Sequence, residues 1–167
     1  MRISIVAWTL LSLIVVGRAR AQEATPPSPP LRLAVQTEAA TGVVTGRFYN
    51  QLVGARVDLQ FSSRVSLGGY LGYVNLKGKD GRASDLLPYA QLEYRTGAPG
   101  DSVRIPFRFA SGYLPRNGPV VRLATGLAFA LTPRVDLVTE LLAPMFWVTN
   151  NQTLLSMNLS LELSFRL

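Results

Sequence analysis

Residues 155–167 read LSMNLSLELSFRL and carry the clearest pattern in the chain. Every second residue from Leu155 to Leu167 is apolar, whereas the residues between them are Ser, Asn, Glu and Arg. Side chains of a β-strand alternate between the two faces of its sheet, and a helix would spread both sets over all sides. This stretch is therefore predicted to be a strand with one apolar and one polar face.

The same period of two recurs upstream, from residue 31 onward. Together with the last stretch it defines eight predicted strands, at residues 31–40, 54–61, 65–76, 86–96, 103–113, 120–131, 135–141 and 155–167. Short links (62–64, 97–102, 132–134) follow the second, fourth and sixth strands, and most other links (41–53, 77–85, 114–119, 150–153) are longer or less regular. Short turns on one side, longer loops on the other and an even strand count are typical of outer-membrane barrels. The predicted fold is all-β, an eight-stranded antiparallel up-and-down transmembrane β-barrel.

The polar faces of these strands combine arginines and carboxylates with Ser, Gly and Ala. Only two lysines occur, and 16% of the residues are charged, against about 25% in soluble domains. Small residues with paired charges suit the narrow lumen of an eight-stranded barrel, and unpaired charges there would be costly. The predicted lumen network contains Arg56, Asp58, Glu93, Arg104, Arg108, Arg122, Asp136, Glu140 and Glu162, with Arg32, Glu38, Arg95 and Arg166 as further candidates. The apolar faces are expected to contact lipid.

The first thirty residues are predicted to lie outside this barrel. A basic start, an apolar run of about 14 residues and the Ala19–Arg20–Ala21 triplet are the pattern of a secretory signal peptide, here with cleavage after Ala21. The alternative is a membrane anchor, but the run is shorter than the roughly 20 residues that span a bilayer as a helix. Residues 22–30 (QEATPPSPP) are predicted to be a proline-rich leader, and residues 31–167 the barrel.

Aromatic residues collect near the ends of the predicted strands. Toward the longer links lie Phe48, Tyr49, Tyr73, Tyr113, Phe146 and Trp147, and toward the short turns Phe61, Tyr94 and Phe165. Two such groups are expected to form the aromatic belts of a membrane barrel. The alternative is the ordinary preference of aromatic residues for strands.

Over residues 31–167 the pattern resembles that of the eight-stranded outer-membrane proteins of Gram-negative bacteria, of the OmpX, OmpW and OmpA-transmembrane-domain kind. The last strand is the most specific part, since Leu159, Leu161, Leu163 and Phe165 match the alternating apolar end that the barrel-assembly machinery reads in those proteins. Here the final residue is Leu167, where they usually have an aromatic. The resemblance implies location in the outer membrane, with membrane lipid, lipopolysaccharide and the assembly machinery as partners.

The residues needed for several kinds of catalysis are missing, because the chain contains no His and no Cys. A His general base, a Ser–His–acid triad and metal sites built on His or Cys are therefore excluded. Some small outer-membrane barrels modify lipid A, and that resemblance would imply a catalytic His. We accordingly expect no enzymatic activity, no cofactor and no metal.

The formal net charge is +7, and removal of Arg2, Arg18 and Arg20 with the signal leaves +4. This charge is small and scattered, which argues against a nucleic-acid partner. A cluster with Lys77, Lys79 and Arg82 is expected to form a solvated loop, with contact to lipopolysaccharide phosphates as the alternative.

The predicted function is a structural or surface-interaction role through the outer loops of a barrel with a filled lumen. The second hypothesis is a soluble periplasmic or secreted barrel that binds a small apolar ligand. It requires the Leu, Val and Phe faces to point inward, so the facing of the strands separates the two hypotheses.

Overall fold

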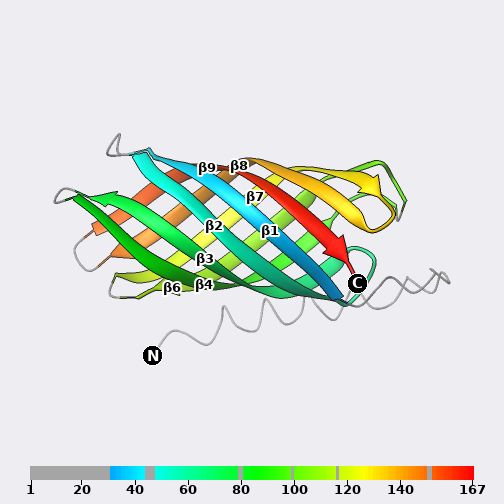
Figure 1. Cartoon of the computed structure of the whole chain (residues 1–167), viewed down its shortest axis with the longest axis horizontal. Helices are drawn as coiled ribbons and strands as arrows, with labels where there is room; N and C mark the ends of the chain where they lie inside the picture. The colour runs from blue at the N-terminus through cyan, green and yellow to red at the C-terminus, as the bar shows by residue number, and fades with distance from the viewer. Residues whose placement is uncertain (1–30, 44–47, 79–80, 99, 116, 150–151) are drawn as a thin grey trace, which may run out of the picture.

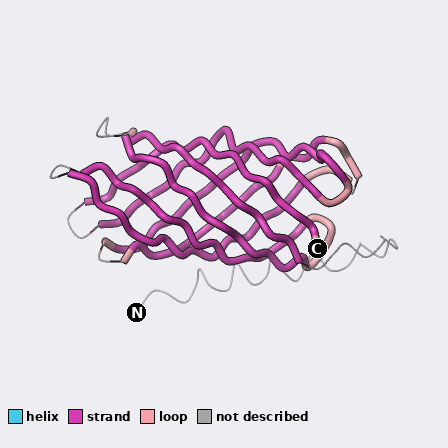
Figure 2. Tube along the Cα trace, viewed as in Figure 1, coloured by secondary structure: helices cyan, strands magenta, loops and turns pink. Residues whose placement is uncertain are grey.

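The computed structural model describes residues 31–43, 48–78, 81–98, 100–115, 117–149 and 152–167. Nearly all of them are in strands (Figure 2). The strands are β1 (Leu31–Gly42), β2 (Phe48–Gln60), β3 (Val65–Gly78), β4 (Gly81–Arg95), β5 (Val103–Arg104), β6 (Pro106–Leu114), β7 (Gly118–Thr132), β8 (Val135–Thr149) and β9 (Gln152–Arg166). No helix among the described residues is long and apolar enough to cross a bilayer. The predicted signal peptide and leader lie outside the described residues.

The strands close into one antiparallel barrel (Figure 1). β1 pairs with β2 on one side and with β9 on the other, and β7 pairs with β8. The segments β5 and β6 both pair with β7 in one continuous register and count as a single barrel strand, interrupted next to Pro106. Proline lacks the N–H that a ladder needs, which accounts for the break. The predicted eight-stranded barrel is confirmed.

The two faces of the strands have opposite chemistry. On the last strand Leu159, Leu161 and Leu163 are exposed on the outer surface, whereas Asn158 and Glu162 are buried inside. The same arrangement holds around the barrel, where the outward residues are mostly Leu, Val, Phe and Tyr. This apolar exterior around a polar interior is what the alternation predicts for a barrel that faces lipid.

Two ends of the barrel are distinguished below. The termini end holds Leu31 and Leu167 and the connections 61–64, 96–102 and 133–134; the hairpin end holds the connections 43–47, 79–80, 115–117 and 150–151. The long links predicted at residues 41–53 and 77–85 are wrong, because most of these residues belong to strands. β3 and β4 stay paired as far as Gly78 and Gly81. Ladder hydrogen bonds come from the backbone, so pairing continues where the apolar alternation fades.

A β-bulge interrupts β8 at two consecutive leucines. Glu140 pairs with Ser160 and Ala143 with Asn158, so β8 carries one extra residue there. Leu141 and Leu142 both point outward, with 58% and 53% of their surface exposed. After the bulge the alternation is reversed, as expected when one residue is inserted into a strand.

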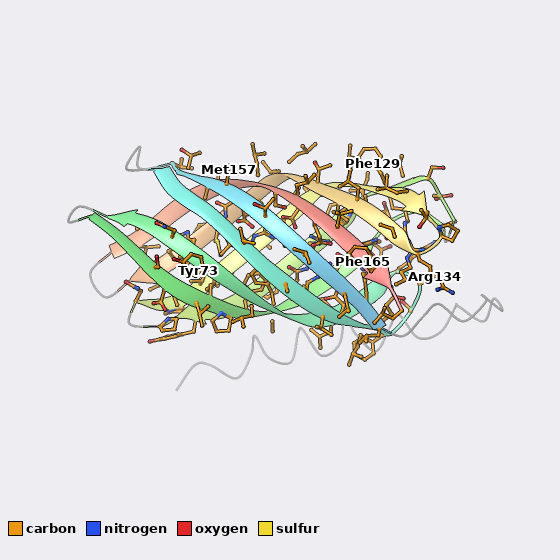
Figure 3. The ribbon with its side chains drawn as sticks, viewed as in Figure 1. Tyr73, Phe129, Arg134, Met157 and Phe165 are labelled. Carbon is orange, nitrogen blue, oxygen red and sulfur yellow. The ribbon has the colours of Figure 1, made fainter. Side chains whose placement is uncertain are left out.

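This reversal corrects the prediction for one aromatic residue. Trp147 was expected in the aromatic group near the outer links, but it lies inside the barrel with 4% exposure, next to the outward Phe146. Outward aromatics do occur toward both ends; Figure 3 labels Tyr73 toward the hairpin end and Phe165 toward the termini end. The side chains of Phe48 and Tyr49 lie outside the described part of the chain.

Candidate functional site: the filled lumen

The lumen holds the charged side chains in one continuous network of ion pairs. They come from all around the barrel, because inward positions of neighbouring strands lie opposite one another. Every carboxylate in the network contacts at least one guanidinium group. All nine residues of the predicted network lie here, together with Arg32, Glu38, Arg95 and Arg166.

Glu93 is surrounded by guanidinium groups. Its Oε1 accepts hydrogen bonds of 2.6 Å from Arg32 Nη1 and of 2.6 Å from Arg95 Nε. Its Oε2 accepts one of 2.6 Å from Arg108 Nε. Charge-assisted bonds of this length are about twice as strong as neutral ones, so Glu93 ties three strands to one point.

Asp136 forms a similar centre nearer to the termini end. It accepts hydrogen bonds from Arg95 Nη1 at 2.7 Å and from Arg104 Nη2 at 3.1 Å. Arg166 Nη2 reaches both carboxylate oxygens, at 2.6 and 2.8 Å. Arg95 therefore bridges Asp136 and Glu93.

Arg108 joins this region to the middle of the lumen. Besides Glu93 it contacts Glu162, at 2.9 Å from Nη2 to Oε1, and Glu140, at 2.7 Å from Nη1 to Oε1. Glu162 also accepts a 2.9 Å bond from Arg56 Nη2, and Arg56 Nε lies 2.9 Å from Asp58. Arg108 is thus shared by three carboxylates.

Toward the hairpin end the network continues through Arg122. Its Nη2 donates to Glu38 at 3.0 Å and also contacts Glu140. Glu38 further accepts a bond from Asn158 and one of 3.1 Å from Gln36 Nε2. These amides satisfy lone pairs that the arginines leave open, as a buried charge requires.

Beyond Arg122 the lumen is filled by apolar and aromatic side chains. This apolar layer consists of Leu52, Tyr70, Val74, Leu87, Tyr89, Ala110, Leu114, Val120, Met145, Trp147 and the partly buried Leu154. Tyr70 and Tyr89 stack with ring centroids 4.2 Å apart and an interplanar angle of 13°. Trp147 Nε1 donates a 2.9 Å bond to Ser156. The lumen therefore holds two different fillings, a charged one and an apolar one.

Several parts of this site escaped the sequence reasoning. The apolar layer was not expected, nor were Gln36, Asn158 and Ser160 as partners of the carboxylates; Ser160 contacts Glu140. The polar partners could have been found from the sequence, because each lies an even number of positions along its strand from a charged residue that points into the lumen. The apolar layer could not, since the bulge in β8 decides that Met145 and Trp147 point inward.

The predicted surface cluster lies at the tip of the β3–β4 hairpin. Lys77 and Arg82 are paired through their backbones, and their side chains, like the whole of Lys79, lie outside the described part of the chain. Among the described residues, no group of three or more His, Cys, Asp or Glu side chains is placed to hold a metal ion.

No protein-family model and no curated protein sequence matches this chain. Several solved structures do match its fold. Neisserial surface protein A superposes with a TM-score of 0.62 at 14% identity, covering 85% of this chain and 100% of that one. The N-terminal β-barrel domain of Pseudomonas aeruginosa OprF gives a TM-score of 0.56 at 11% identity, with 83% and 100% coverage.

A de novo designed transmembrane β-barrel also matches, with a TM-score of 0.51, 12% identity and coverage of 86% and 100%. At such low identities the likeness concerns the fold. The predicted resemblance to eight-stranded outer-membrane barrels is confirmed: this chain has the fold of a closed transmembrane β-barrel.

Proposed function

We propose that this protein is a non-enzymatic outer-membrane barrel with a closed lumen, which serves a structural or surface-interaction role. One observation carries the proposal: the charged side chains are buried inside, whereas Leu, Val and Phe cover the outside. A soluble protein rarely exposes such a large continuous apolar surface. A lipid bilayer is the solvent in which this exterior is stable.

The closed lumen follows from its two fillings. The charged side chains of the network pair with one another, and the apolar layer lies across the lumen toward the hairpin end. An eight-stranded barrel has an interior only wide enough for its own side chains. We infer that the barrel does not form an open channel for ions or solutes.

The outer membrane as the location is supported by the fold and by the sequence. The apolar run and the Ala19–Arg20–Ala21 triplet favour export with cleavage after Ala21. With both ends of the barrel at the termini end, the hairpin end would face outward and the last strand would be read by the assembly machinery. Lipid and lipopolysaccharide would then be its surroundings.

A surface role would use the hairpin tips rather than long loops, since the strands extend almost to the turns. The tip with Lys77, Lys79 and Arg82 is the candidate contact for lipopolysaccharide phosphates, because Lys and Arg bind phosphate through charge-assisted hydrogen bonds. The competing function, a soluble barrel with an apolar ligand inside, needs the opposite facing. The buried arginines and carboxylates of the lumen speak against it.

The first test is fractionation of cells that express the full chain, combined with gel migration of unboiled and boiled samples. We expect the protein in the outer-membrane fraction and a different migration of the unboiled form. Recovery in the soluble fraction, without heat-dependent migration, would overturn the proposal.

The closed lumen is tested separately, in planar lipid bilayers. Purified protein should give at most small and rare conductance events. Large, stable conductance steps would show that the fillings leave a path, and would refute the closed lumen while leaving the membrane location intact.

A further inference from the structure

The charge network is unevenly distributed along the lumen. Near the termini end, two carboxylates, Glu93 and Asp136, share five guanidinium groups, those of Arg32, Arg95, Arg104, Arg108 and Arg166. Farther in, Glu38, Glu140 and Glu162 share Arg56, Arg108 and Arg122. Positive charge is therefore in excess toward the termini end, even with Asp58 near Arg32 and Arg56.

The centre at Asp136 opens toward this end of the barrel. Its three arginines become more exposed outward: the side chain of Arg95 is 2% exposed, that of Arg104 8% and that of Arg166 19%. Arg95 also pairs with Glu93, so the network as a whole sets seven guanidinium groups against six carboxylates, and the one positive charge in excess lies on the side of this centre. Buried or half-buried charge is costly unless it is paired.

One donor at this centre has no partner in the structure. The Nη2 atom of Arg95 is buried and makes no hydrogen bond. A buried, charged donor left without an acceptor costs more than a neutral one. An added acceptor next to Arg95, Arg104 and Arg166 would satisfy it and offset the excess charge.

The rim of the same end is also basic. Arg64 and Arg134 are exposed in the turns between β2 and β3 and between β7 and β8, and Figure 3 shows Arg134 beyond the end of the barrel wall. Neither forms an ion pair with another described residue. Asp101 lies in the remaining connection at this end, residues 96–102, and accepts a 2.6 Å hydrogen bond from the Ala98 N–H within the same loop.

This rim lies where the apolar exterior ends. Phe61 and Leu131, next to the two turns, are 67% and 56% exposed. In a bilayer such residues reach the edge of the hydrocarbon, and arginines beyond them extend to the level of the phosphate groups.

We propose that the termini end of the barrel is a binding site for a phosphate group. Arg104 and Arg166 donate to its oxygens from the mouth of the lumen, with Nη2 of Arg95 behind them, and Arg134 contacts it from the rim. Guanidinium groups bind phosphate oxygens in pairs of parallel hydrogen bonds, which favours this oxyanion class. The phosphate belongs either to a lipid headgroup in the adjacent leaflet or to a free ion; the lipid source rests on the proposed membrane location.

The site is tested with the full chain folded in an uncharged detergent that contains no phosphate, with inorganic phosphate as the probe. Binding is measured by calorimetry at constant ionic strength for the unchanged chain and for Arg104→Gln, Arg134→Gln and Lys77→Gln. Lys77 lies at the opposite end of the barrel and serves as the matched control. Heat-dependent gel migration verifies that each variant is folded.

We expect saturable binding that Arg104→Gln weakens about tenfold or more, since the variant loses a hydrogen bond between two charged groups. Arg134→Gln should weaken it less, and Lys77→Gln should leave it unchanged. Because Arg134 is exposed, its variant tests the site even if Arg104→Gln does not fold. Absence of saturable binding, or equal loss in the Lys77 variant, would overturn the proposal.

A second arm separates the two sources. The chain is placed in nanodiscs of phosphatidylcholine with or without phosphatidic acid, and retained lipid is counted by native mass spectrometry. Retention of phosphatidic acid that falls in Arg134→Gln identifies a headgroup, and equal retention in both chains identifies free phosphate. Phosphate binding in detergent does not depend on cellular location, so its failure is distinguishable from failure of the membrane assignment.

Discussion

The two halves of the lumen solve the same packing problem with opposite chemistry. Toward the termini end the space is filled by arginines and carboxylates, with Arg108 shared by Glu93, Glu140 and Glu162. Toward the hairpin end it is filled by the apolar layer around the Tyr70–Tyr89 stack. In the charged half, each side chain has a large effect on the stability of the barrel, because every buried charge needs its partners. In the apolar half, stability depends on how closely the side chains pack.

The two halves of the lumen are therefore destabilised by different kinds of substitution. A network of buried ion pairs tolerates few single changes, since removing one partner leaves the other charged and alone. A packed apolar layer loses contacts in proportion to the atoms removed. The following predictions test this contrast, starting with the largest effect.

Arg108→Met should be the most damaging substitution. It removes the guanidinium shared by Glu93, Glu140 and Glu162, and breaking a buried pair costs about 3–5 kcal/mol. The measurement is urea unfolding of the barrel in lipid vesicles, followed by tryptophan fluorescence. Arg108→Lys keeps the charge without the planar fork and should lose less. A loss below about 1 kcal/mol for Arg108→Met would mean that the network is not essential to stability.

Leu161→Arg places a guanidinium group on the outer face of the barrel, which is otherwise apolar. Leu161 points outward next to the buried Glu162, and an arginine at the lipid face near the bilayer midplane costs about 2–4 kcal/mol. Vesicle unfolding measures this cost, with Leu161→Met as the control, expected below about 1.5 kcal/mol. Equal stability of the arginine variant would contradict the assigned facing.

Gly126→Ala tests the bulge that shapes the apolar half. A Cβ at Gly126 would collide with the carbonyl oxygen of Thr139 and would lie 2.7 Å from Cα of Glu140. Both are backbone atoms, so the strands must separate, at a cost of about 1–3 kcal/mol. Gly69→Ala is the matched control, since a Cβ there meets nothing within 4 Å. Similar unfolding midpoints for the two variants would argue against this close approach.

Trp147→Phe should have the smallest effect. It removes the Nε1 hydrogen bond to Ser156, while Ser156 Oγ still contacts Asn158 Oδ1 at 2.8 Å. Loss of one such bond corresponds to about 0.5–1.5 kcal/mol. Thermal unfolding followed by circular dichroism measures it. A loss larger than that of Arg108→Met would reverse the contrast between the two halves.

Much of the fold could be predicted because alternation is a local property. The period of two around Glu162 and around Asp58 is enough to assign which side chains share a face. The same argument predicted that the charges gather in the lumen. The argument stopped at Leu141, because two adjacent leucines end the alternation there, and the sequence alone does not tell whether the strand ends or continues past a bulge with its faces reversed.

The connections show the same limit. Residues 41–53 and 77–85 looked like long loops because their apolar alternation fades, yet most of them pair as strands up to Gly78 and Gly81. The longest connection, residues 96–102, lies at the termini end. The lengths of the links therefore do not distinguish the two ends of the barrel in the way that the sequence analysis assumed.

The alternating residues alone are enough to predict strands with one apolar and one polar face, because side-chain direction depends only on position along a strand. The pairing of partners depends on the closed barrel: Arg56 contacts Glu162, and Asn158 contacts Glu38, across more than 100 positions of the chain. Closure and register bring such residues together, and the bulge in β8 turns Met145 and Trp147 inward. These depend on how all strands pair, which no single stretch of sequence specifies.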